Sequence, residues 1–460
     1  MSKKKDTQPK TEEKKAREPK DPNLRCKAYK FRLYPTKKQV GKLEWMMRRC
    51  KELYNAALQE RRDAYKMCGV SVSYRMQADQ LPAIKKLREE YRDLHSQVLQ
   101  EVLKRLDKAF QAFFRRVMNG EKPGYPRFKN GDRYHSLTYP QGGFEILHGK
   151  RLHLSKIGPI KIKLHREMQG KVKTCTIKKE GEQWYAVLTC EYKHNPTTTF
   201  HPSEEEIGID LGVKVFAMLS TGEPIEKPRH YRMEEEKIAA AHQKINRCKP
   251  RSHRRNRAKK ELSRLYRKVR HRRRDFHHKE SRKLVNRYQV IVFEDLQITN
   301  LTATPKPKQD SETGKYLPNG AATKAGLNKS ILDAGWGNFV HLCASKAEEA
   351  GGTVVKVPPH NTSQACHRCG TIVPKDLSVR WHSCPECGEE LDRDHNSALE
   401  VLHRYQRQKP TLPPYVGVLG QEVSHRNPRL VWRDTHPVEA PGVIRGVLHE
   451  SSLIPDESPF

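Results

Sequence analysis

The chain has 460 residues, of which 35% are hydrophobic and 31% are charged. That length allows two to four domains, and the apolar content is sufficient for real cores with solvated segments between them. Lys and Arg number 89 against 54 Asp and Glu, which gives a formal net charge of +35. This imbalance points to a polyanionic partner. An acidic membrane surface is a weaker alternative, because no apolar run approaches the roughly 18 residues of a spanning helix.

Residues 1–23 are rich in Lys, Glu and Pro and almost free of apolar side chains. Such a segment cannot offset its ordering entropy by burial, so we predict that it is disordered. It is either a solubilising tail or a nonspecific phosphate-binding arm. It lacks the apolar core of a signal peptide. We therefore expect an intracellular protein with reduced thiols, in which the scattered cysteines are inert.

Helical and strand patterns alternate along the first half of the chain. Alternating apolar residues in Cys26–Pro35 predict a strand, and Thr36 is a candidate N-cap for the helix that follows. A second helical block spans Tyr74–Met118, and its aromatic residues fit a core better than a surface that stacks on bases. From Phe144 to Lys193 the period becomes two, which predicts short strands. We expect these strands and the first one to form a small β-barrel with the helices inserted.

The second half begins with a strand–turn–strand pattern at residues 205–220. Val290–Asp295 is a buried-strand run that ends in acids, and residues 302–327 have the Thr, Pro, Lys and Gly content of a mobile loop. Helices are predicted at Asn328–Ala350 and Asp394–Tyr405.

The helical section between residues 230 and 288 is the most basic part of the chain. Its middle, Lys249–Arg274, holds 14 Lys and Arg and one acid, and Pro250 marks a hairpin between two helices. A charged run of this kind is usually a solvated face. So dense a charge repels itself, however, and a phosphate backbone is its natural counterion. We predict nucleic-acid contacts for Arg251, Arg254, Arg255, Arg257, Lys259, Lys260, Arg272, Arg273 and Arg274.

The strongest chemical signal is the spacing C-x₂-C-x₁₄-C-x₂-C. Each C-x₂-C turn presents two thiolates to one metal, and four thiolates complete a tetrahedral Zn²⁺ site. Disulfides are the alternative, which an intracellular setting disfavours. A closed site of four cysteines has no open coordination position, so the predicted zinc is structural. Its ligands are Cys366, Cys369, Cys384 and Cys387. The loop between the pairs either contacts nucleic acid or is purely structural, and it carries Lys375, Arg380, Trp381 and His382.

Three carboxylates stand at positions where strands and helices begin or end. Asp210 lies in a Gly-Ile-Asp-Leu-Gly turn, Glu294 ends a buried strand, and Asp394 stands at a helix start. Burying three carboxylates together is costly unless cations bind, and two Mg²⁺ ions about 3.5–4 Å apart would satisfy them. Such a pair supports phosphodiester hydrolysis. Any single Asp is more simply a helix cap or a surface acid, and Asp295 and Asp392 are the neighbouring alternatives.

Eight segments carry a family resemblance when they are taken together and in order. They are FRLYPTKKQ, GYPRFKN, GIDLGVKVFA, HKESRKLV, FEDLQITNL, DAGWGNFVHLCASKAEEAGGTVVKV, TSQACHRCG and CPECGEELDRDHNSA. These segments resemble the TnpB family, RNA-guided nucleases that bacterial insertion sequences encode and that are related to type V CRISPR effectors. The resemblance covers most of residues 24–405.

The resemblance implies an α+β multidomain fold. Its parts are an RNase H-like (RuvC) nuclease core with an inserted zinc ribbon, and a β-barrel wedge domain with an inserted helical recognition domain. The implied catalytic and Mg²⁺-binding triad maps onto Asp210, Glu294 and Asp394. The expected boundaries are 1–23 for the basic tail, 24–36 and 131–200 for the wedge, 37–130 for the recognition domain, 201–360 and 391–408 for the nuclease (with the basic hairpin at 230–288), 361–390 for the ribbon and 409–460 for a Pro-rich tail.

The implied function is RNA-guided, Mg²⁺-dependent cleavage of DNA that supports an insertion sequence. The partners would be a guide RNA from the element end and double-stranded target DNA with a short adjacent motif, in a cytoplasmic, nucleoid-associated protein without a membrane partner. Two rival functions are an RNA-guided repressor with an inactive site and an unguided DNA-joining transposase. All three acids are present, which argues against the repressor.

Overall fold

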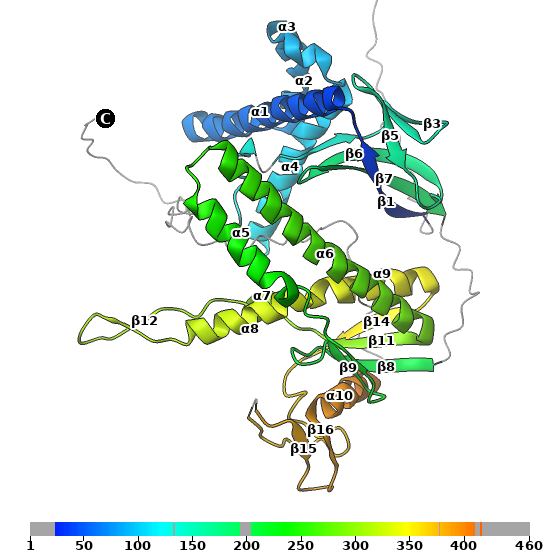
Figure 1. Ribbon diagram of the computed structural model, residues 1–460, viewed down its shortest axis with the longest axis vertical. Coiled ribbons are helices and arrows are strands. Elements are labelled where there is room, and N and C mark those ends of the chain that lie inside the picture. Colours follow the sequence, from blue (N-terminus) through cyan, green and yellow to red (C-terminus); the bar gives the residue numbers. More distant parts are fainter. Residues whose placement is uncertain (1–23, 132–133, 194–203, 377, 410–414, 416–460) are drawn as a thin grey trace, which may run out of the picture. The chain divides into compact units, whose positions relative to one another are not determined.

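A seven-stranded antiparallel sheet occupies the N-terminal half, in the order β2-β6-β7-β1-β5-β4-β3 (Figure 1). The computed structural model describes residues 24–131, 134–193, 204–376, 378–409 and 415, so the segment 1–23 and nearly all of the predicted tail lie outside it. The strands are β1 (Leu24–Tyr34), β2 (Ser136–Tyr139), β3 (Phe144–Leu147), β4 (Arg151–Leu154), β5 (Gly158–Lys163), β6 (Lys171–Glu180) and β7 (Gln183–Lys193). The predicted pairing of the first strand with the later ones is confirmed, since β1 pairs with both β5 and β7.

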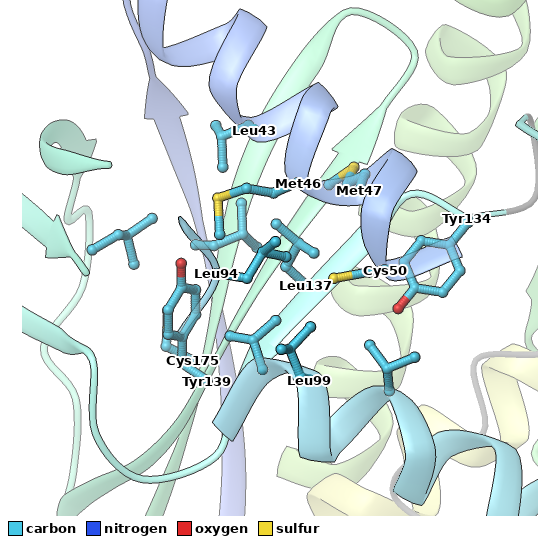
Figure 2. Close-up of a cluster of buried hydrophobic side chains, with 14 of the residues drawn as sticks. Leu43, Met46, Met47, Cys50, Leu94, Leu99, Tyr134, Leu137, Tyr139 and Cys175 are labelled. Carbon is cyan, nitrogen blue, oxygen red and sulfur yellow. The ribbon is translucent and has the colours of Figure 1, made fainter. Parts of the chain in front are cut away.

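This sheet is a half-barrel, whereas the sequence predicted a small β-barrel. Among the described residues no pairing joins its edge strands, β2 and β3. Helices cover its apolar face instead, so that sheet and helices share one core. Figure 2 shows side chains from α1, α4, β2 and β6 meeting in this core.

The helices inserted after β1 are α1 (Lys37–Cys68), α2 (Tyr74–Asp79), α3 (Leu81–Leu87) and α4 (Ser96–Met118), with a 3₁₀ turn at Glu89–Asp93. Thr36 caps α1 as predicted: its side chain accepts a hydrogen bond from the Gln39 N–H, and the Gln39 side chain accepts one from the Thr36 N–H. The aromatic residues of α4 are only partly core, because Phe110 is buried whereas Phe114 is exposed.

The second half contains a five-stranded mixed sheet in the order β10-β9-β8-β11-β14. Its strands are β8 (Glu204–Asp210), β9 (Ala217–Leu219), β10 (Pro224–Ile225), β11 (Tyr288–Glu294) and β14 (Thr353–Val357). β8, β11 and β14 are mutually parallel, and β9 and β10 extend the sheet in antiparallel pairings.

Helices cover both faces of this sheet (Figure 1). On one face, α6 (His253–Arg287) and α9 (Trp336–Ala350) pack over apolar side chains that include Ile209 and Phe293. On the other face, α10 (Arg393–Gln408) packs through Val401 and Tyr405 against Val292 and its neighbours. Since side chains of a strand alternate between faces, Asp210 and Glu294 belong to the face that α10 covers.

The predicted helical hairpin is confirmed. Helix α5 (Glu235–Arg247) follows a 3₁₀ turn at Arg232–Glu234 and packs against α6, and the turn between the two helices contains Pro250. The shared apolar stripe is thin, with Ile238, Ala241 and Ile245 facing Ala258, Leu262 and Val269.

Two predictions for residues 302–350 are wrong. The expected loop contains a small hairpin, β12 (Lys308–Gln309) with β13 (Tyr316–Leu317), after the short helix α7 (Ile298–Leu301). The expected single helix is two helices, α8 (Ala321–Ala334) and α9. Gly335 separates them with φ +68°, a left-handed conformation that ends one helix and starts the next.

The remaining strands, β15 (Trp381–Ser383) and β16 (Glu390–Asp392), pair in the region of the paired cysteines. Of the predicted tail, Lys409 and Tyr415 are described, and the Tyr415 N–H donates to the Val354 carbonyl at 2.7 Å. No helix among the described residues is long and apolar enough to cross a membrane.

Candidate active site and metal-binding cysteines

Asp210 and Glu294 end two neighbouring parallel strands. Asp210 is the last residue of β8 and Glu294 is the last residue of β11. The residues before them, Ile209 and Phe293, are direct partners in the pairing of these strands. The two carboxylates therefore stand at the same edge of the sheet and on the same face.

Helix α10 brings the third acid to this edge by packing closely on β8. Gly208 permits the approach: a Cβ at this position would lie 2.3 Å from the Ala398 carbonyl oxygen and 2.8 Å from the Leu402 Cβ. Only glycine leaves room for the helix backbone here. Behind this contact, His395 Nε2 lies 3.2 Å from the Ser220 carbonyl oxygen, which ties the first turn of α10 to the segment after β9.

Asp392 and Asp394 have different places at the start of α10. Asp392 is the N-cap, and its Oδ1 accepts hydrogen bonds from the N–H groups of Asp394 (2.8 Å) and His395 (3.3 Å). A capping carboxylate of this kind typically stabilises a helix by about 1 kcal/mol. Asp394 lies in the first turn, and its side chain is 13% exposed.

The charges of the three acids interact. Burial and the nearby carboxylates of Glu294 and Asp394 raise the pKa of Asp210 well above its ordinary value, and the Arg393 guanidinium opposes this shift. Burial also raises the pKa of Glu294, which is 7% exposed. Such shifts mean that the ionised carboxylates are destabilised where they stand, a condition that a bound cation relieves.

Two arginines lie beside Asp394. Its Oδ1 is 3.4 Å from Arg393 Nη2 and 3.6 Å from Arg380 Nη1. Arg393 also donates to the Val379 carbonyl, and its backbone N–H donates to the Arg380 carbonyl. The loop between the cysteine pairs therefore reaches the edge of the sheet that holds Asp210, Glu294 and Asp394, which we call the acidic edge.

Thr362 is a site residue that sequence reasoning missed. Its side chain is buried, and its hydroxyl donates a short hydrogen bond to Glu294 Oε1. This bond and the Arg404 charge both oppose the raised pKa of Glu294. The only signal in the sequence was the position of Thr362 four residues before the first paired cysteine, which does not identify a hydroxyl donor.

The four paired cysteines converge as predicted. The Sγ atoms of Cys366, Cys369, Cys384 and Cys387 all lie within 4.8 Å of one another. Two of these separations are 3.6 Å for Cys366–Cys387 and 3.5 Å for Cys369–Cys384. These are too long for an S–S bond of about 2.05 Å. They are close to the spacing of about 3.8 Å that tetrahedral geometry gives for metal–sulfur bonds of about 2.3 Å.

The other residues of the cysteine loop have separate roles. His382 is buried and contacts the ammonium group of Lys375, which is partly buried. Trp381 is 55% exposed and Arg380 lies at Asp394. The contact between Lys375 and His382 supports a structural role for these two residues. Trp381 lies at the surface, and Arg380 lies beside Asp394.

Five of the nine cations predicted to contact nucleic acid have partners within the protein. Arg255 donates to the Ile245 and Cys248 carbonyls at the end of α5, and Arg272 binds the Glu234 carboxylate at 3.0 Å. Arg273 binds Asp333 at 2.8 Å, and Lys260 binds Glu182 at 2.7 Å. Arg274 donates to His278 Nε2 at 3.3 Å. The other four are exposed along α6 and the turn before it: Arg251, Arg254, Arg257 and Lys259.

Three family models match parts of the chain. They are described as "Probable transposase" (residues 189–304), "Cas12f1-like, TNB domain" (336–401) and "Helix-turn-helix domain" (25–69). The last region consists here of strand β1 and the single helix α1, not of a helix-turn-helix.

Similar proteins cover most of the chain. "Putative RNA-guided DNA endonuclease InsQ" of Escherichia coli (strain K12) is 30% identical over 82% of this chain and 92% of its own length. "Putative RNA-guided DNA endonuclease" of Streptomyces pristinaespiralis is 29% identical over 82% of this chain and 88% of its own. A solved structure, "Cryo-EM structure of the Cas12f1-sgRNA-target DNA complex", aligns with 85% of this chain and 100% of its own at 13% identity and a TM-score of 0.48. Given the extent and identity of the first match, the chain belongs to the TnpB family.

Proposed function

We propose that this protein is an RNA-guided DNA endonuclease of an insertion sequence, and that Asp210, Glu294 and Asp394 form its catalytic site. The names of its relatives support the activity. One observation carries the assignment of the site: three acids from β8, β11 and α10 stand at one edge of a sheet, where burial and then the charges of Glu294 and Asp394 raise the pKa of Asp210.

The strand order supports an RNase H-like core built from residues 204–360 and 391–408. An antiparallel β10-β9-β8 unit joined to parallel β11 and β14 is the arrangement expected of such a core. The half-barrel of residues 24–36 and 134–193 would be the wedge domain, and the helices of residues 37–118 would be the recognition domain. The cysteine region, 361–390, is inserted between β14 and α10.

The acidic edge has the donor set that Mg²⁺ prefers, since carboxylate oxygens are the ligands of hard cations. Asp210, Glu294 and Asp394 would hold the metal. When bound, Mg²⁺ activates a water and stabilises the leaving oxygen in phosphodiester hydrolysis. The protein keeps the carboxylates in place through the strand ends, the cap of α10 and the Thr362 hydrogen bond. Arg393 and Arg380, which lie beside Asp394, would bind the scissile phosphate.

The cysteine cluster would hold one structural Zn²⁺. Four thiolates with no other donor close the coordination sphere, so the site has no position for a substrate. It would stabilise a segment with few apolar contacts of its own.

The exposed cations of α6 would contact the backbone of guide RNA or of the RNA–DNA duplex. A protein that reads backbone shape, while base pairing reads sequence, needs such a surface. The guide RNA from the element end, the double-stranded target and its short adjacent motif are the partners we propose.

Sequencing of the RNA that co-purifies with the protein, expressed with its flanking DNA, tests this function. A guided nuclease should retain one dominant RNA with a constant scaffold and a variable end. Recovery of random cellular RNA alone would favour an unguided transposase.

A further inference from the structure

The segment Pro358–His367 connects β14 to the first cysteine pair, and it contacts both Glu294 at the end of β11 and helix α10. Thr362, in its middle, contacts Glu294, and the rest of the segment is bonded to α10, the helix that carries Asp394. One short segment therefore contacts the elements of two of the three acids.

The contact with Glu294 is specific and buried. Thr362 is 4% exposed and Glu294 is 7% exposed. The hydroxyl has one proton, for which Glu294 Oε1 and the more distant Pro359 carbonyl, at 3.2 Å, are the acceptors. The proton is directed to Glu294, because the Pro359 carbonyl is neutral and farther away. The resulting hydrogen bond fixes the rotation of the Glu294 carboxyl group.

The contacts with α10 extend along three turns of the helix. Asn396, which is fully buried, accepts from the His367 N–H at 3.1 Å and donates to the Ala365 carbonyl at 2.7 Å. His403 Nδ1 lies 2.7 Å from the His367 carbonyl oxygen. Arg404 donates to the Pro358 carbonyl at 2.9 Å and to the His360 carbonyl at 2.6 Å. Five backbone contacts from three side chains give the segment a defined place on the helix.

We propose that Thr362 is a positioning residue for Glu294, held at that place by the attachment of Pro358–His367 to α10. The inference rests on the proposed function, in which Glu294 binds the catalytic metal. Groups that orient a metal ligand without touching the metal typically change metal affinity or activity by about 10–100-fold when they are removed.

The test compares Thr362→Val, which keeps the shape and removes the hydroxyl, with Thr362→Ser, which keeps the hydroxyl. Ser363→Val is the matched control, because Ser363 is the exposed neighbour. Each variant is loaded with guide RNA and assayed for DNA cleavage over a range of Mg²⁺ concentrations. Without DNA, the increase in unfolding temperature on addition of Mg²⁺ is measured, together with zinc content and RNA binding.

We expect Thr362→Val to need at least about 10-fold more Mg²⁺ for half-maximal cleavage, and to gain less thermal stability from Mg²⁺. Thr362→Ser and Ser363→Val should behave as the wild type, and zinc content and RNA binding should not change. Wild-type Mg²⁺ dependence in Thr362→Val would overturn the inference. So would equal losses in the Val and Ser variants, or a loss of zinc and RNA binding in parallel with cleavage, since each indicates a structural role.

Glu294→Gln separates this inference from the proposed function. If Glu294→Gln still cleaves DNA, the catalytic assignment of Glu294 is wrong. If Glu294→Gln is inactive while Thr362→Val has the Mg²⁺ dependence of the wild type, only the positioning role is wrong.

Discussion

Gly208 and Ala398 lie so close that a Cβ on Gly208 would be 2.3 Å from the Ala398 carbonyl oxygen. The contact joins β8, which ends at Asp210, to α10, which carries Asp394. The geometry of the acidic edge therefore depends on a residue that has no side chain.

Gly208→Ala should push α10 away from β8. Forced overpacking of this kind typically costs about 1–3 kcal/mol, and we expect cleavage to be lost before the fold is. Denaturant unfolding and a cleavage assay measure the two effects. Gly337→Ala on α9 is the control, because a Cβ there meets nothing within 4 Å. It should leave cleavage unchanged and stabilise the protein by at most about 1 kcal/mol.

Asp210→Asn should stabilise the metal-free protein while it abolishes cleavage. The ionised Asp210 is destabilised by burial and by its acidic neighbours, and the amide removes that charge. In Mg²⁺-free buffer that leaves the zinc bound, the variant should unfold at a higher temperature than the wild type, whereas Mg²⁺ should stabilise the wild type more. Asp295→Asn is the matched control, since this more exposed acid pairs with Lys356. A wild type that gains no stability from Mg²⁺ would argue against metal binding at the acidic edge.

Cys366→Ser should abolish the retention of zinc and lower the yield of folded protein. Removing one of four thiolates opens the coordination sphere, and metal binding is coupled to folding of such knuckles. Elemental analysis should give about one zinc per chain for the wild type and for Cys68→Ser, which alters an exposed cysteine outside the cluster. Unchanged zinc in Cys366→Ser would refute the four-cysteine site.

Two arginines of α6 should respond differently to replacement by Ala. Arg273→Ala leaves Asp333 buried without its ion-pair partner, and loss of one member of a buried pair typically costs about 3–5 kcal/mol. Arg257 is exposed, so Arg257→Ala should change stability by less than about 0.5 kcal/mol. It should instead weaken RNA binding. The slope of the logarithm of the affinity against the logarithm of the salt concentration should decrease by about 1, the amount expected for the loss of one phosphate contact. Salt titrations of RNA affinity and thermal unfolding distinguish the two roles.

His277 should make the protein sensitive to mild acid. Burial lowers the pKa of His277 to about 4, and its ring lies between the Ala334 carbonyl at 2.8 Å and the Asn338 amide at 3.0 Å. Between about pH 6.5 and pH 4 the unfolded chain therefore binds a proton that the folded protein does not bind. The free energy of unfolding should decrease over this range as the pH falls, by up to about 3 kcal/mol.

His277→Gln should remove part of that pH dependence, because burial also lowers the pKa of the neighbouring His278 to about 4. His148→Gln, at an exposed histidine, should keep the pH dependence of the wild type. Denaturant unfolding at several pH values measures the difference. Parallel curves for the wild type and His277→Gln would show that other groups cause the acid sensitivity.

Patterns with a fixed period or a fixed spacing could be predicted from the sequence. The strand at Cys26–Pro35, the Thr36 cap, the helical hairpin at Pro250 and the four converging cysteines are of this kind. Each depends on residues that are close in the sequence or on a spacing that one metal imposes.

Features that depend on contacts between distant segments were missed. Gly335 reads as an ordinary glycine in a helical pattern, and only its φ of +68° beside His277 separates α8 from α9. The internal partners of Arg255, Arg272 and Arg273 could not be distinguished from solvated charges, because their acceptors lie on other elements. Thr362 contacts a residue 68 positions away, which no local pattern encodes.

The central claim is that Asp210, Glu294 and Asp394 cut DNA under the direction of a bound RNA. The most direct measurement is cleavage of a plasmid that carries a sequence matching the variable end of the co-purified RNA, by wild type and by Asp210→Asn at equal RNA occupancy. We predict Mg²⁺-dependent cleavage at the matching sequence by the wild type alone. Cleavage that ignores the RNA sequence, or equal cleavage by Asp210→Asn, would contradict the proposal.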